Sequence, residues 1–82
     1  MAGTDRSRKF LGEALARARK AAGVTQETLA FEAELDRTYI SHLENGHKSP
    51  TVDTLFRICP VLGIAPSQLI SQVERALESR RK

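Results

Sequence analysis

Apolar residues recur at helical spacing along the chain, and no stretch alternates between apolar and polar residues as a half-buried strand would. Glycine and proline interrupt the pattern at short intervals, where helices typically end or begin. We therefore expect an all-α fold. Its five helices should cover about residues 6–22, 25–33, 36–45, 51–62 and 66–79.

The expected helix over 51–62 is irregular because it contains Pro60. Proline lacks an N–H group, and its ring crowds the carbonyl of the residue four positions earlier, which is Phe56. We therefore predict that this helix kinks or ends near Cys59. The side chains expected to face inward from it are Val52, Leu55, Phe56 and Leu62.

The helices over 25–33 and 36–45 are short and almost adjacent. Thr25 and Asp36 suit the N-cap positions, because their side-chain oxygens accept hydrogen bonds from free N–H groups of the first turn. Gly46 suits the left-handed conformation that ends the second helix. The tight joint predicts a helix-turn-helix, in which the first helix braces the second. The exposed side of the second helix would then enter a DNA major groove about 12 Å wide.

The exposed side of the helix over 36–45 carries compact hydrogen-bonding groups. At about 100° per residue, it lies opposite the apolar residues Leu35, Ile40 and Leu43. The guanidinium fork of Arg37 matches O6 and N7 of guanine. A merely solvated face is the alternative interpretation, but such a face would be expected to carry several lysines or glutamates. The candidate base-reading residues are Arg37, Thr38, Ser41 and His42.

Length and composition narrow the class of protein. A chain of 82 residues has room for one domain, 1–82, with one small core. The single Cys59 excludes an internal disulfide, and one cysteine with two separated histidines does not make a zinc site, so no metal or cofactor is expected. The longest nearly apolar run, 58–66, is far shorter than the roughly 20 residues of a membrane span. Because "MAGTDRSRKF" is polar and unlike a secretory signal, we expect no membrane partner and a cytoplasmic location.

The net charge of +3 is unevenly distributed. Lys and Arg outnumber Asp and Glu by six to two over residues 1–20 and by six to three over 47–82, whereas residues 21–46 hold one basic and five acidic residues. The basic ends are suited to binding phosphate. A solvated N-terminus and an ordinary basic tail explain them equally well.

The last expected helix, over 66–79, has more apolar surface than one small core requires. A domain of this size commonly needs a partner subunit. We therefore predict a two-fold dimer seam, which would place two recognition helices one DNA turn, about 34 Å, apart on a palindrome. The alternative is a helix that folds back on its own core. The candidate seam residues are Leu69, Ile70, Val73, Ala76 and Leu77.

The stretch "GVTQETLAFEAELDRTYISHLENGHKSPTVDTLFRICPVLGI" resembles the lambda-repressor-like, Xre/Cro-type helix-turn-helix family. The match covers about residues 8–70, with its elements in the family's order and spacing. It implies a five-helix lambda-repressor-like domain. The segment "LDRTYIS" and the following Glu44 are especially similar to small controller proteins of restriction–modification systems, which dimerise through their last helix. The shared elements are Gln26, Leu29–Ala30, Tyr39–Ile40, Glu44–Gly46, Pro50–Thr51 and Leu62–Gly63.

The resemblance implies roles for residues outside the base-reading set. Arg19 and Glu44 would form a buried ion pair that ties the first helix to the end of the third. Glu34 occupies a turn position usually filled by glycine, and His47 stands where a more basic residue is common. The residues implied to contact the DNA backbone are Gln26, Tyr39, Asn45, His47 and Lys48.

The sequence therefore predicts a transcriptional regulator that binds a palindromic operator in double-stranded DNA as a homodimer. Repression and activation both remain open. Acidic Glu27, Glu32 and Glu34 would suit a basic surface of RNA polymerase, or would simply keep the domain soluble. The alternative is a helical protein-interaction module, antitoxin-like or an adaptor, which the acidic segment 21–46 favours. No candidate nucleophile has a partner base, so neither an enzyme nor a small-molecule substrate is expected.

Overall fold

The computed structural model describes residues 2–79, with side chains from residue 6 onward. Within these residues it contains helices and no strand, which confirms the all-α prediction. The last three residues of the basic tail, 80–82, lie outside the described part. The helices are α1 (Ala2–Ala21), α2 (Gln26–Ala33), α3 (Arg37–Glu44), α4 (Val52–Leu62) and α5 (Pro66–Ser79).

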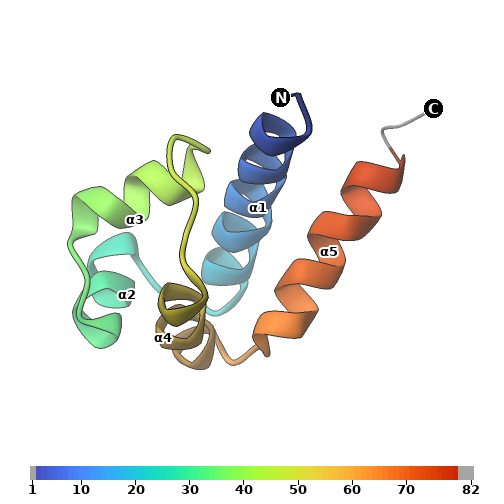
Figure 1. Ribbon diagram of the computed structural model, residues 1–82. Coiled ribbons are helices and arrows are strands. Elements are labelled where there is room, and N and C mark those ends of the chain that lie inside the picture. The colour runs from blue at the N-terminus through green and yellow to red at the C-terminus, as the bar shows by residue number, and fades with distance from the viewer. Residues whose placement is uncertain (1, 80–82) are drawn as a thin grey trace.

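The first helix, α1, runs through the middle of the fold (Figure 1). It packs against α3 on one side and α5 on the other, while α2 contacts α3 and α4. α1 begins at Ala2, earlier than the expected start near residue 6. Thr25 and Asp36 cap α2 and α3 as predicted, and their side chains accept hydrogen bonds from the N–H groups of Thr28 and Thr38.

Two clusters of buried side chains hold the helices together. The larger cluster joins α1, α2, α3 and α4, and it places the predicted inward faces of α2 and α3 against α1. The smaller cluster joins α1, α4 and α5 and contains Cys59, whose burial raises the pKa of its thiol. The most deeply buried large side chains are Leu15, Leu29, Ile40, Leu43, Ile58 and Leu69.

Two predictions about α4 are wrong in part. Of the residues predicted to face inward, Leu55 and Leu62 are buried, but Val52 and Phe56 are 68% and 62% exposed, because residues four positions apart share one helix face and the opposite face is the buried one. The helix also continues past Cys59 to Leu62 instead of ending there, while the alternative of a kink stays a prediction. Pro60 lies in the last turn, where it removes one backbone hydrogen bond. That turn is closed by Gly63 N–H and Ile64 N–H, which donate to the carbonyls of Pro60 and Cys59 at 3.2 Å each.

The close approach of α1 and α3 depends on Gly12, which the sequence pattern did not single out. A Cβ atom at this position would lie 2.5 Å from the carbonyl oxygen of Leu43 and 2.6 Å from that of Glu44. No side chain fits in that space, so glycine is required where α1 crosses the end of α3.

Candidate nucleic-acid interface

The turn between α2 and α3 sets the orientation of α3. Its central residue, Glu34, has φ +59° and ψ +47°, the left-handed conformation that is costly for residues with a Cβ atom. The Leu35 N–H donates to the carbonyl of Ala30 at 2.8 Å and closes the turn. Glu34 therefore adopts the backbone geometry that glycine would supply, and the turn is preserved at an energetic cost.

The predicted base-reading residues occupy one side of α3. Arg37 and Thr38 are exposed, and Ser41 and His42, one turn later, are half-buried. Ile40 and Leu43 on the opposite side are buried in the larger core cluster, so the helix cannot rotate about its axis without exposing them. This arrangement fixes which side chains α3 presents to the outside.

Most of the predicted backbone-contacting residues lie around the end of α3. Asn45 is its C-cap, and its side-chain Nδ2 donates to Ser41 Oγ at 3.4 Å. His47 and Lys48 are exposed in the loop that follows, whereas Tyr39 is half-buried and packs against the larger core cluster. These residues border the outer face of α3 without belonging to it.

A buried polar network attaches α3 to α1 and α2. Arg19 donates from Nε and Nη2 to the two carboxylate oxygens of Glu44, at 2.6 and 3.0 Å, and the side chains are 12% and 6% exposed. Arg19 Nη1 also donates to the carbonyl of Val24 at 2.9 Å. The hydrogen bond to Glu44 raises the pKa of Arg19, an effect that burial opposes. The ion pair implied by the resemblance is thus present and bidentate.

Gln26 belongs to the same network, which the sequence did not indicate. Its Nε2 donates to Glu44 Oε1 at 3.0 Å, so its side-chain amide is held against the end of α3. Gln26 is also the first residue of α2, where backbone N–H groups have no partner within the helix. It combines a fixed side chain with a helix N-terminus suited to an anion.

The two histidines meet at the edge of this surface, another contact that sequence reasoning missed. Nδ1 of His42 lies 3.5 Å from Nδ1 of His47, and the ring centroids are 5.7 Å apart. The backbone brings them together, since the His47 N–H donates to the carbonyl of His42 at 2.9 Å across the end of α3. The sequence did contain a signal for this contact, which is Gly46. A left-handed glycine at the end of a helix directs the next residue, His47, back toward the last turn of the helix.

A helix-turn-helix family profile matches residues 15–69, most of the chain. The protein belongs to the helix-turn-helix family. A Sinorhizobium fredii protein described as an uncharacterized HTH-type transcriptional regulator, y4dJ, is 34% identical over 67 residues, which cover 82% of this chain and 87% of that protein. Control protein C.BamHI of Bacillus amyloliquefaciens is 43% identical over 47 residues, which cover 57% of this chain and 58% of that one.

The fold of the helix-turn-helix domain is also found in a solved structure. The restriction-modification controller protein C.AhdI from Aeromonas hydrophila superposes with a TM-score of 0.72 at 32% identity, over 84% of this chain and 98% of that chain. These comparisons confirm the lambda-repressor-like fold and the family that the motif indicated. None of the three relatives is described as an enzyme.

The apolar stripe of α5 in this helix-turn-helix protein divides into two parts. Leu69 and Val73 are 0% and 7% exposed because they pack in the core of the single chain. Ile70 is 41% exposed, and Ala76 and Leu77 are half-buried. Leu69 therefore has no surface left to offer a partner, and the outward part of the stripe centres on Ile70 and Leu77.

Among the described side chains, those of residues 6–79, no three His, Cys, Asp or Glu are grouped so that they would hold a metal ion. No single described helix is long and apolar enough to cross a membrane. Only α4 and α5 together meet that test of length and composition, and they are bent by 104° relative to each other.

Proposed function

We propose that this helix-turn-helix transcriptional regulator binds a palindromic operator in double-stranded DNA as a homodimer, in the cytoplasm, with one α3 in the major groove of each half-site. The observation that carries the proposal is the outer face of α3. It is held by a buried inner face and by the Arg19–Glu44 network, and it presents only compact polar groups and one arginine. A rigid helix with such a face is suited to reading base edges.

The proposal gives base contacts to the outer face of α3 and DNA-backbone contacts to residues that border this face. Arg37, in the first turn, would bond guanine O6 and N7, and Thr38 would contact a base or a thymine methyl group. Ser41 and His42 would follow one helical turn later along the groove. The proposed backbone contacts come from the N-terminus of α2 at Gln26 and from the bordering residues Tyr39, Asn45, His47 and Lys48.

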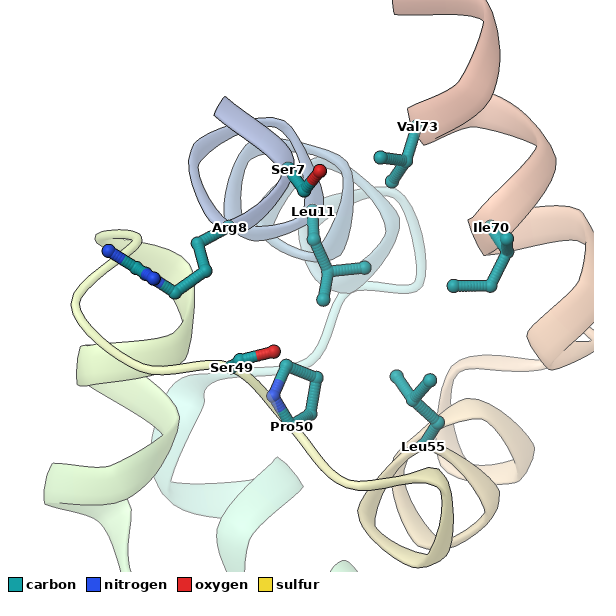
Figure 2. A pocket seen from close by; sticks show the side chains of 8 residues that line it. All are labelled: Ser7, Arg8, Leu11, Ser49, Pro50, Leu55, Ile70 and Val73. Carbon is teal, nitrogen blue, oxygen red and sulfur yellow. The ribbon is translucent and has the colours of Figure 1, made fainter. Parts of the chain in front are cut away.

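The dimer proposal rests on apolar surface that the single chain leaves uncovered. A groove of about 300 Å³ opens between α1, α4 and α5, with Leu55 and Ile70 on facing walls (Figure 2). Val52 and Phe56 are exposed on α4, the helix that supplies Leu55. Burying a large aliphatic or aromatic side chain contributes about 1.5–3 kcal/mol, so a second copy docked through α5, residues 66–79, would be stabilised by covering this surface.

Activation through RNA polymerase is supported by the outer face of α2. Phe31 is 80% exposed, Glu27 is exposed one turn before it on the same side of the helix, and Glu34 is exposed at the C-cap of α2. An exposed aromatic residue flanked by carboxylates suits a basic protein surface. C.BamHI is described as a control protein and C.AhdI as a restriction-modification controller, which supports a controller role for this chain.

A second candidate function is a protein-interaction module, antitoxin-like or an adaptor. The net charge of −4 over residues 21–46, one basic against five acidic residues, is the observation that favours it. The same helices would then contact a protein instead of DNA.

Selection of bound fragments from a random oligonucleotide pool tests the proposal. We expect a palindrome with half-sites one helical turn apart, and an affinity that falls as salt rises because phosphate contacts release counterions. Selection that enriches no sequence, together with no salt-dependent mobility shift of mixed genomic DNA, would instead support the adaptor.

A further inference from the structure

The contact between His42 and His47 joins a proposed base-reading residue to a proposed backbone-contacting residue. Their Nδ1 atoms face each other at 3.5 Å, a long hydrogen-bond distance. In each ring Nε2 is a separate nitrogen that the Nδ1 contact does not use. Within the described residues, the contact between the two Nδ1 atoms is the side-chain interaction that joins the rings.

A facing pair of Nδ1 atoms is favourable only when one carries a proton and the other does not. Two N–H groups would repel each other, and so would two lone pairs. A neutral imidazole carries its single proton on one of the two nitrogens, so the state of one ring fixes the state of the other. The contact therefore couples the protonation of the two Nε2 atoms.

We propose that His47 is a specificity-determining positioning residue, which decides through its hydrogen bond to His42 whether Nε2 of His42 donates or accepts at the DNA base edge. This inference rests on the proposed DNA-binding function. Neutral His47 that donates from Nε2 to a phosphate has a lone pair on Nδ1. His42 then donates from its own Nδ1 and presents an acceptor at Nε2. That acceptor matches the amino groups of adenine N6 and cytosine N4.

Protonation of His47 reverses the polarity of the pair. Imidazolium carries N–H groups on both nitrogens, so His47 donates from Nδ1 and His42 must accept there. His42 then carries its proton on Nε2 and donates to guanine O6 or N7, thymine O4 or adenine N7, whereas cytosine offers it no acceptor. The base preferred by His42 changes with the proton on a residue that does not touch a base.

The charged groups near the His42–His47 pair are basic, apart from one carboxylate that already accepts hydrogen bonds from other residues. From α1, Arg8 Nε donates to the carbonyl of Gly46 at 3.4 Å, and the backbone of Lys9 lies against Gly46. Lys48 follows His47 in the loop, and Glu44 in α3 is bonded to Arg19 and Gln26. These basic groups suit a phosphate contact at His47.

Base preference at the half-site position nearest His42 tests the inference. At about pH 8 we expect wild type to favour adenine or cytosine there. The His47→Lys variant, whose ammonium group only donates, should favour guanine or thymine over cytosine by about fivefold, the equivalent of one hydrogen bond. Lys48→Ala is the matched control, expected to weaken binding to all sequences while keeping the wild-type preference.

Long-range ¹H–¹⁵N NMR of the imidazole rings in the DNA-free protein supplies a test that does not depend on DNA binding. At about pH 8 we expect complementary tautomers, with one ring protonated at Nδ1 and the other at Nε2, and loss of this pattern in His47→Ala. The inference is overturned if both rings are protonated at Nε2, or if wild type and His47→Lys show the same preference between cytosine and guanine or thymine. Failure to enrich any DNA sequence would overturn the proposed function, while the NMR result would still decide whether the histidines are coupled.

Discussion

Two helices of this protein, α3 and α5, are both amphipathic, but their apolar sides are buried to different extents. The apolar side of α3 is completely covered, with Ile40 and Leu43 at 0% and 2% exposure. The apolar side of α5 is only partly covered, since Leu69 is buried and Ile70 remains 41% exposed. What remains outside is therefore polar on α3 and partly apolar on α5.

This difference indicates what kind of partner each helix takes. A polar face on a helix that is fixed from behind costs little to hold in water and offers directional hydrogen bonds, as a base-reading surface requires. An exposed apolar strip next to an apolar groove is favourable only when it is covered, which points to a protein surface. The proposed division between DNA reading by α3 and dimerisation by α5 follows from this contrast.

The largest expected effect comes from Glu44→Ala, which removes the carboxylate that fixes the end of α3. It leaves Arg19 and Gln26 without their buried partner, so we expect the free energy of unfolding to fall by about 3–5 kcal/mol in urea denaturation. Glu74→Ala, an exposed change on α5, is the control and should stay within about 0.5 kcal/mol of wild type. A similarly small loss for Glu44→Ala would mean that the network does not hold α3.

Ile70→Asp tests whether the outer strip of α5 is covered by a second copy. Loss of a buried isoleucine contact weakens association by about 1.5–3 kcal/mol per side chain, so analytical ultracentrifugation should show a folded monomer. Gln72→Asp changes another exposed residue of α5, on a different side from Ile70, and should leave the dimer intact. A wild-type monomer at all concentrations would refute the dimer.

Arg37→Ala tests the outer face of α3. We expect a loss of about 1–3 kcal/mol on the cognate site and relaxed preference at one base pair, measured by mobility shift with single-base variants of the operator. Lys48→Ala should instead weaken all sequences alike and flatten the salt dependence. Equal losses on cognate and random DNA for Arg37→Ala would contradict its base-reading role.

The smallest expected effect comes from Glu34→Gly in the turn that orients α3. Glycine removes the left-handed strain of about 1–2 kcal/mol but adds about 0.5–1 kcal/mol of unfolded-state entropy. We therefore expect slight stabilisation, under about 1 kcal/mol, in thermal unfolding. Glu32→Gly removes the same type of side chain within α2, where glycine costs about 1 kcal/mol, and should destabilise the protein. Destabilisation by both changes would show that the Glu34 side chain matters more than its backbone strain.

Much of the fold was predictable because its signals are local. Hydroxyl and carboxylate caps at Thr25 and Asp36 act within one turn of their helices, and the inward faces of α2 and α3 follow from helical periodicity alone. The outer face of α3 was predicted in the same way. Its role in DNA binding stays a proposal, since geometry defines the face but not the ligand.

Two of the residues predicted to face inward from α4 face outward, and Pro60 does not end the helix, which was one of its two predicted effects. Apolar residues lie on both faces of α4, so periodicity did not reveal that Val52 and Phe56 point outward. A proline in the last turn interrupts only one hydrogen bond, so it did not end the helix. Both errors concern interactions outside the local turn: what a helix packs against, and how its end is closed.

The amino-acid sequence by itself determined five short helices, their caps and the polar composition of the face that α3 presents. Each of these features arises from interactions between residues a few positions apart. Only the tertiary structure decided that α1 contacts the end of α3 at Gly12. It also decided that Gln26 bonds to Glu44 and that Leu69 is buried in the core of the single chain. These depend on distances between segments remote along the chain, which are set only when the helices pack together.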